Sequence, residues 1–296
     1  MDLEKYMEGH RARVDGALAC LLPSSTKEPH KLHEAMRYSV FSGGKRFRPI
    51  LALATCEAME GECDNVLPLA CAVEMIHAYS LIHDDLPAMD NDVLRRGQPT
   101  CHVAFGEALA ILAGDALLAE AFRVLTDASL YPHAKPETLL RVAWDVALAS
   151  GPLGMAGGQT ADVQSTGQEV SLPLLEYIHV HKTGELIRAT VLGAAKLSGA
   201  APSQLEALSI YGKLMGLAFQ IADDVLDVVG EPSLLGKEVL SDQRKGKLTY
   251  PLLLGIEESR GRAVDLVEQG IQSIHFLGPK AQRLRELARY IVDRQW

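Results

Sequence analysis

Aromatic side chains are scarce in this sequence, and its cysteines form no motif. Phe, Trp and Tyr make up 5% of the 296 residues. This disfavours a strand-rich fold, because aromatic and β-branched side chains are the strongest strand formers. The five cysteines are odd in number and none are spaced as C-x-x-C. The sequence therefore predicts neither a disulfide framework nor a zinc site.

Basic residues are outnumbered by acidic ones, 29 to 38, which gives a formal net charge of −9. Such a surface repels polyanions, so we expect neither nucleic acid nor an anionic membrane as a partner. The N-terminus is charged from its second residue and has no apolar signal core. Polar residues such as Glu74 and Asp115 interrupt every long apolar stretch, and none predicts a membrane span. We therefore expect a cytoplasmic protein.

Helical periodicity dominates the chain. Apolar residues recur at three- and four-residue spacing, and no segment alternates like a strand before a two-residue turn. Without a linker or a repeat, this pattern predicts one large all-α domain over residues 1–296. The predicted helices cover residues 2–21, 31–41, 48–59, 66–87, 104–127, 137–150, 173–199, 202–229, 249–260 and 280–294.

The segment FQIADDVLDVVG, residues 219–230, sets carboxylates among apolar side chains. Asp223 and Asp227 are four residues apart and share one face of a helix, and Gln220 and Asp224 form the next such pair. Carboxylates in apolar surroundings need a counter-charge, and closely spaced oxygen ligands suit Mg²⁺. The pattern favours a metal site over the alternative, a set of buried ion pairs.

The segment HDDLPAMDND, residues 83–92, places four aspartates in ten positions. On an uninterrupted helix, Asp84 and Asp90 would point about 120° apart and could not share a metal ion. Pro87 disfavours helix at the residue before it. We therefore expect the helix to end or bulge around Asp85–Pro87, so that Asp90 folds back toward Asp84.

Basic residues beside glycine complement the two acidic clusters. Several divalent ions held by these clusters would need a further anion, and a diphosphate fits. Glycine beside lysine or arginine lets the backbone approach phosphate closely. One such dipeptide alone is more often surface charge, but this chain has five basic sites. They are GGKRFRP (43–49), LRRG (94–97), HKTG (181–184), GK (236–237) and GKLTYP (246–251).

These motifs, in this order, resemble those of the trans-isoprenyl diphosphate synthases, and within that family most of all the bacterial farnesyl diphosphate synthases. The resemblance covers about residues 30 to 255. It implies an antiparallel helical bundle around a central cavity, assembled as a homodimer. It also implies a Mg²⁺-dependent prenyltransferase that condenses isopentenyl diphosphate with dimethylallyl or geranyl diphosphate.

The resemblance further implies a set of metal ligands. Three Mg²⁺ ions would stabilise the departing pyrophosphate, so that an allylic cation forms and the double bond of isopentenyl diphosphate attacks it. The released pyrophosphate would then accept the lost proton. The implied ligands are Asp84, Asp85, Asp90, Asp223, Asp224 and Asp227.

The resemblance also assigns basic and polar residues to the two substrates. Thr183 and Gln220 would direct oxygen dipoles at the cation. Gly184 suits a local helix break that frees the Thr183 carbonyl, the alternative being a glycine required only for packing. Isopentenyl diphosphate would be held by Gly44, Lys45, Arg48, His77 and Arg96, and the allylic diphosphate by Arg95, Lys182, Lys237 and Lys247.

Product length is predicted from the residues just before the first acidic cluster. Tyr79 and Ser80 lie five and four residues before Asp84. A growing prenyl chain would meet them about one helical turn below the aspartates. Within the family, an aromatic ring there and the two extra residues of DDLPAMD indicate farnesyl diphosphate. Geranylgeranyl diphosphate is the alternative product.

Three other classes of protein share part of this pattern. A class I terpene cyclase would carry an N-x-x-x-S/T-x-x-x-E metal motif where this chain has DDVLD. A phosphohydrolase of the HD type would need further histidine ligands, and His77 with the distant His102 is a poor set. A non-catalytic synthase subunit would show eroded acidic motifs, whereas both are intact.

We also predict that the polar stretch 230–251 is a lid, the alternative being a plain solvated loop.

Overall fold

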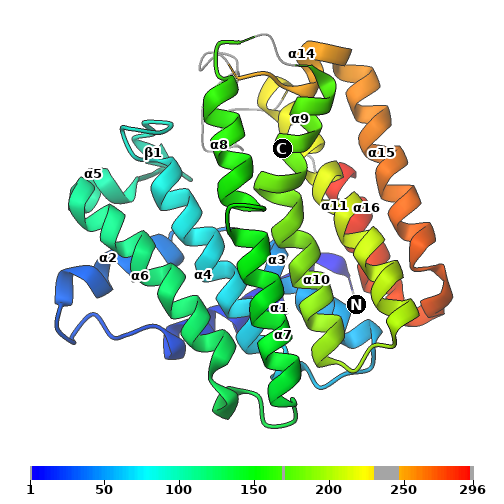
Figure 1. The fold of residues 1–296 in the computed structure, drawn as a ribbon, viewed down its shortest axis with the longest axis horizontal. Coiled ribbons are helices and arrows are strands. Elements are labelled where there is room, and N and C mark those ends of the chain that lie inside the picture. The colour runs from blue at the N-terminus through cyan, green and yellow to red at the C-terminus, as the bar shows by residue number, and fades with distance from the viewer. Residues whose placement is uncertain (1, 169–170, 230–246, 294–296) are drawn as a thin grey trace.

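The chain folds almost entirely into helices, as the sequence predicts (Figure 1). The computed structural model describes residues 2–168, 171–229 and 247–293. The longer helices there are α1 (Leu3–Leu21), α2 (His30–Val40), α3 (Phe47–Ala58), α4 (Leu67–Asp84), α6 (Glu107–Thr126), α7 (Pro136–Ser150), α8 (Met155–Ser165), α9 (Leu172–His179), α10 (Glu185–Leu197), α11 (Pro202–Val229), α15 (Ile256–Ser273) and α16 (Gln282–Asp293).

Short elements join these helices. A π-helix, η3 (Val180–Gly184), separates α9 from α10. Strands β1 (Leu94–Arg95) and β2 (Gln98–Pro99) form a small antiparallel hairpin after α4. The remaining elements are α5 (Cys101–Phe105), α14 (Tyr250–Leu254) and the 3₁₀-helices η1 (Cys63–Asn65), η2 (Ala128–Leu130) and η4 (His275–Ala281).

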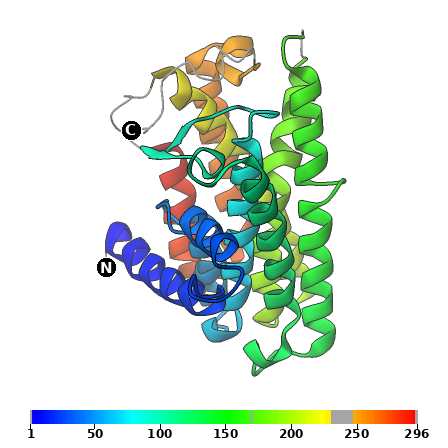
Figure 2. The same cartoon turned by 90° about the vertical axis from the view of Figure 1, so that its left-hand side faces the viewer.

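Helix α4 lies inside the bundle because its buried residues are apolar except for Glu74, which pairs with Arg46. It packs against α3 and α6, while α10 packs against α3, α7 and α11, and α15 covers α11 (Figure 1). The blue helices α1 and α2 lie on one flank (Figure 2). By length and composition alone, Cys63–Asp84 would suffice to cross a membrane. However, 67% of its most apolar window is buried, as in the core helix of a bundle.

Several predicted elements need correction. The segment 173–199 is interrupted by the π-helix, and the helical region predicted at 249–260 is a short α14 followed by α15, which continues to Ser273. Helix α15 buries Ser259, Ala263, Val267 and Gly270, so its buried stripe consists mostly of small residues. Such a stripe gives a weak apolar period, which is why the end of α15 was misplaced.

Helix α8 and the β-hairpin were not predicted. Helix α8 contains Gly157 and Gly158, which disfavour helix in an isolated segment. A side chain at Gly158 would lie 2.2 Å from the backbone nitrogen of Lys182, so close packing against η3 requires glycine there. In the hairpin, Arg96 and Gly97 both have positive φ, 53° and 76°, which fits a two-residue turn.

Candidate active site

The first acidic segment turns back on itself at the end of α4, as predicted. Helix α4 ends at Asp84, and the chain then turns through Pro87. The backbone N–H of Asp90 donates to the carbonyl of Asp84 at 2.8 Å, and that of Asn91 donates to Leu86 at 3.1 Å. The interruption at Pro87 therefore brings Asp90 beside Asp84 despite their spacing in sequence.

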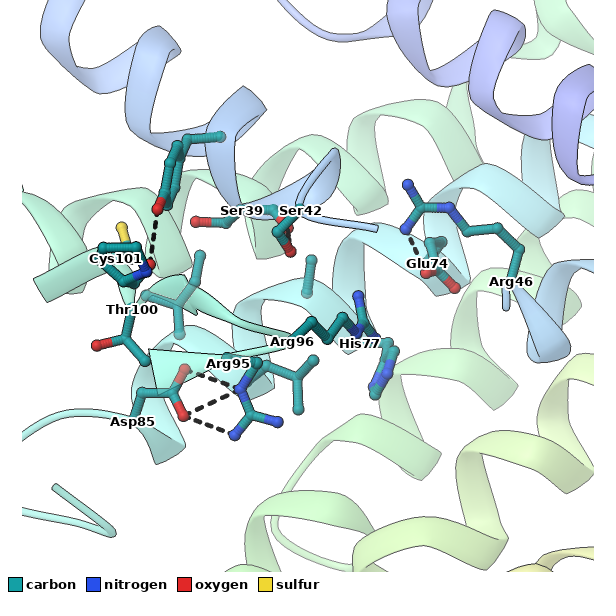
Figure 3. Close-up of a pocket in the computed structure, with 15 residues that line it drawn as sticks. Ser39, Ser42, Arg46, Glu74, His77, Asp85, Arg95, Arg96, Thr100 and Cys101 are labelled. Carbon is teal, nitrogen blue, oxygen red and sulfur yellow. Dashed lines mark hydrogen bonds and ion pairs between the residues drawn. The ribbon is translucent and has the colours of Figure 1, made fainter. Parts of the chain in front are cut away.

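Asp84 and Asp85 point in different directions. Asp84 lines a large cavity. Asp85 is buried and accepts hydrogen bonds from Arg95, with Nε at 3.0 and 2.9 Å from its two oxygens and Nη2 at 2.6 Å from Oδ1 (Figure 3). Both Asp85 oxygens thus accept from one guanidinium, and the role of Asp85 as a metal ligand stays a prediction.

Burial raises the pKa of the Asp84 carboxyl. Asp90 acts in the same direction, whereas Lys182, Lys247 and Arg95 oppose the shift. A carboxylate held in this position is costly unless a cation approaches it. Its environment therefore favours a bound cation near Asp84.

The second acidic segment lies on one continuous helix, α11, and its neighbouring aspartates also diverge. Asp223 lines the same cavity as Asp84. Asp224 is buried and accepts from His179 Nε2 at 2.9 Å and from the Tyr250 backbone N–H at 3.0 Å. The role of Asp224 as a metal ligand stays a prediction, whereas the predicted pairing of Gln220 with Asp224 is confirmed by a 3.5 Å contact. Asp227 is 2% exposed.

Two lysines and two carboxylates form a group of ion pairs, of which Lys182 lines the cavity. Lys182 Nζ lies 2.7 Å from Asp162 of α8. Lys247 Nζ lies 2.8 Å from Asp90 and 3.8 Å from Asp162. Sequence reasoning missed Asp162. The only indication was its spacing of three residues from Gln159, which puts both on one helical face within a glycine-rich segment.

The carboxylates are not gathered into a ready metal cluster. Within residues 2–168, 171–229 and 247–293, no group of three or more His, Cys, Asp or Glu side chains has the arrangement of a metal site. The donor chemistry nevertheless fits Mg²⁺, which takes one or two carboxylates and completes its shell with water and phosphate. Asp84, Asp90 and Asp223 supply such oxygens, and Asp84 lies where a cation is favoured.

The predicted helix break at Gly184 is confirmed as the π-helix η3. A side chain at Gly216 of α11 would lie 2.5 Å from the Gly184 Cα, so the two elements cross closely. The Thr183 hydroxyl donates to Gln220 Oε1 at 2.9 Å, and both residues line the cavity. Single π-helical turns often occur at functional sites, because they redirect side chains within a helix.

A second group of predicted residues makes one wall basic. Arg48 lines the cavity, and its buried Nε has no hydrogen-bond partner among the described residues. Burial lowers the pKa of His77 well below its usual value, and nearby arginines lower it further, including Arg48 and Arg96. Figure 3 shows His77 beside Arg96. A neutral imidazole close to several guanidinium groups is an environment that attracts an anion.

The glycine-rich loop lies against the β-hairpin. Gly44 has a φ of +119°, and a Cβ there would lie 2.6 Å from Arg96 Nη1. Arg96 donates to the carbonyl of Gly43. The neighbouring Arg46 is instead part of the core, because it pairs with Glu74 at 2.9 Å (Figure 3) and with Asp15 at 2.8 Å. Lys45 Nζ lies 5.4 Å from the centre of the Tyr290 ring on α16.

The cavity has a volume of about 720 Å³. Its apolar lining includes Leu86, Met89, Ile111, Met155 and Phe219. The Gln159 amide also lines it, and both polar atoms of the amide are buried without a hydrogen bond in the part of the chain that the structure describes. Lys237 lies outside the described residues, as does most of the predicted lid 230–251. The predicted residues that line the cavity are Arg48, His77, Tyr79, Ser80, Asp84, Arg95, Arg96, Lys182, Thr183, Gln220 and Asp223.

Comparison with known proteins shows the family of this chain. The family model described as polyprenyl synthetase matches residues 29–276. The chain is 46% identical to farnesyl diphosphate synthase of Escherichia coli, with 99% of both chains covered. It is also 44% identical to a geranylgeranyl diphosphate synthase of Cyanophora paradoxa, covering 99% of this chain and 97% of the relative.

A solved structure has the same fold. An FPP/GFPP synthase from Zymomonas mobilis, in an apo structure, superposes with a TM-score of 0.87 at 39% identity, with 98% of both chains covered. The match extends over both acidic segments and the cavity between them. The chain therefore belongs to the polyprenyl synthetase family of trans-prenyltransferases.

Proposed function

We propose that this chain condenses isopentenyl diphosphate with an allylic diphosphate, and that its main product is farnesyl diphosphate. One observation carries the proposal. A single cavity is lined by carboxylates from two separate helices, by the lysine of η3 and by a basic wall of Arg48, His77 and Arg96. It therefore offers two differently charged positions for two diphosphates.

The allylic diphosphate is assigned to the side where carboxylates and lysines meet. Mg²⁺ dependence is a property of the family. When bound by Asp84, Asp90 and Asp223, three such ions would supply the charge that stabilises the leaving diphosphate. Lys182 and Lys247 would leave their present carboxylate partners and bind its oxygens. Arg95 would also bind these oxygens while Asp85 continues to anchor it.

Isopentenyl diphosphate is assigned to the basic wall. Arg48, Lys45 and Arg96 would neutralise it directly, and the close approach of Gly44 to Arg96 shapes the position. The neutral His77 would donate a hydrogen bond without requiring protonation. Thr183 and Gln220 would turn oxygen dipoles toward the developing allylic cation, and the apolar lining would exclude water from it.

Tyr79 supports farnesyl diphosphate as the product. Its ring lines the cavity and makes an edge-on contact with His83, with the ring centres 5.7 Å apart. A ring one turn below Asp84 would stop a lengthening chain. Both farnesyl and geranylgeranyl diphosphate synthases occur among the relatives, so geranylgeranyl diphosphate is the second candidate.

Incubation with Mg²⁺, isopentenyl diphosphate and geranyl diphosphate, followed by chain-length analysis, tests the proposal. Farnesyl diphosphate is expected from the unmodified chain, and longer products from Tyr79→Ala, because the smaller side chain opens the cavity. Ser80→Ala serves as a matched control with little change in volume. Absence of condensation would refute the proposed activity, and an unchanged Tyr79→Ala product would place the stop elsewhere.

We also propose that the protein is a single-domain homodimer located in the cytoplasm. Leu140, Trp144 and Leu148 recur at four-residue spacing along α7 and are 71%, 52% and 37% exposed. Ile111 and Leu112 of α6 are also exposed. A second copy would cover this stripe, since exposed apolar rows of this kind mark interfaces. Sedimentation analysis should give a dimer, and Trp144→Glu should give a monomer.

A further inference from the structure

Asp224 joins three parts of the fold from a position facing away from the cavity. Its Oδ2 accepts from His179 Nε2 at 2.9 Å and from the Tyr250 N–H at 3.0 Å. His179 ends α9 directly before the π-helix, and Tyr250 begins α14, three residues after Lys247. One carboxylate on α11 therefore holds both segments that carry the lysines of the allylic side.

The hydrogen bonds continue from Asp224 to the cavity. An ionised carboxylate only accepts hydrogen bonds, so the Gln220 amide turns its NH₂ toward Asp224 Oδ1, at 3.5 Å. Its Oε1 is then left to accept from the Thr183 hydroxyl at 2.9 Å. The contacts run from His179 through Asp224 and Gln220 to Thr183, and they fix which end of the amide lies beside Thr183.

Neighbouring side chains make further contacts with this chain of hydrogen bonds. The His179 ring stacks on the Tyr250 ring, with centres 5.5 Å apart and planes inclined by 26°. The Tyr250 hydroxyl donates to Glu176 at 3.1 Å, and Arg262 of α15 pairs with the same carboxylate. The side chains of His179 and Asp224 are 8% and 4% exposed. A buried polar network with its partners satisfied holds one geometry.

We propose that His179 is a positioning residue which, through Asp224, holds η3 and the Lys247 segment in the arrangement that receives the allylic diphosphate. This inference rests on the proposed function. Isopentenyl diphosphate is assigned to α3, α4 and the β-hairpin instead. Loss of the His179 contact is therefore expected to affect the two substrates unequally.

Hydrogen exchange of the full-length chain without substrates tests the positioning itself. His179→Phe keeps a ring against Tyr250 but removes the N–H donor, and Asp224→Asn keeps the shape but removes the charge. Amides in 180–184 and 249–254 should exchange about tenfold faster in both variants, since a hydrogen bond to a charged group is lost. His179→Gln restores a donor and should recover part of the protection.

His181→Gln is the matched control for exchange. His181 lies in the same π-helix but contacts the Tyr177 carbonyl through Nδ1, at 2.7 Å on the exposed side. Exchange in 180–184 and 249–254 should remain as in the unmodified chain. Equal exchange in His179→Phe and the unmodified chain would overturn the proposal.

Steady-state kinetics test the unequal effect on the substrates. In His179→Phe, KM for geranyl diphosphate should rise about tenfold, while KM for isopentenyl diphosphate changes by less than about twofold. An equal change in both would indicate general loosening and would overturn the proposal. Inactivity of the unmodified chain would refute the proposed function and the substrate-specific part of the inference. The exchange result would still decide whether the His179 contact positions these segments.

Discussion

The two acidic segments differ in backbone conformation, but each places one aspartate of an adjacent pair at the cavity and buries the other. In the first, α4 ends at Asp84 and the chain turns back, whereas in the second α11 runs straight through Asp223 and Asp224. Each has a pair of adjacent aspartates. In both, the first member, Asp84 or Asp223, lines the cavity. The second member, Asp85 or Asp224, is buried against a donor elsewhere.

The partners of the second members differ, and this difference assigns them different tasks. Asp85 holds Arg95, a side chain that itself lines the cavity. Asp224 holds an imidazole and a backbone N–H, and so fixes elements rather than one ligand. Adjacent helical residues diverge by about 100°, so a pair cannot place both carboxylates on one ion without distortion. We therefore propose that the second aspartate of each pair holds neighbouring groups in place and does not bind the ion.

The largest effect is expected from neutralising the first members. Asp84→Asn and Asp223→Asn should each lower kcat about 10²–10³-fold, because stabilisation of the leaving diphosphate is lost. Condensation assays at saturating Mg²⁺ measure this. Circular dichroism should show an unchanged helical content. Near-normal turnover in either variant would mean that its carboxylate is structural.

A smaller effect is expected from Asp85→Asn. The amide cannot reproduce the paired hydrogen bonds to Arg95, so the guanidinium loses its orientation. The KM for the allylic diphosphate should rise about tenfold, with a smaller change in kcat. A loss of turnover as large as that of Asp84→Asn would remove the distinction between the two positions.

The smallest effect concerns stability without Mg²⁺. Burial raises the pKa of Asp84, so its ionised form opposes folding at neutral pH. Asp84→Asn should therefore increase the free energy of unfolding at neutral pH. The gain should shrink as the pH falls and Asp84 becomes protonated in the unmodified chain. Urea titrations at two pH values measure it, and a destabilised variant at neutral pH would contradict the reasoning.

Helix geometry and the effect of proline on the backbone predicted those parts of the site that lie within one segment. Pro87 sufficed to predict the fold-back of Asp90, and four-residue spacing sufficed to predict the Gln220–Asp224 pair. The resemblance supplied Gly184, and η3 confirmed the break. Each feature depends on neighbours within a turn or two.

The missed features depend on packing between segments. Asp162 reaches Lys182 only because Gly158 lets α8 pack closely on η3, and a glycine-rich sequence gives no helical period. The orientations of Asp85 and Asp224 depend on Arg95 and His179, which lie on other elements. Sequence spacing gives the angle between adjacent aspartates, but it does not tell which one faces the cavity.

Calorimetry of inorganic pyrophosphate binding in the presence of Mg²⁺ tests the central claim most directly, using the four single Asp→Asn variants. We expect Asp84→Asn and Asp223→Asn to abolish binding. We expect Asp85→Asn and Asp224→Asn to retain it, weakened by about tenfold or less. Equal loss in all four variants would contradict the division of each pair into a cavity-facing ligand and a supporting residue.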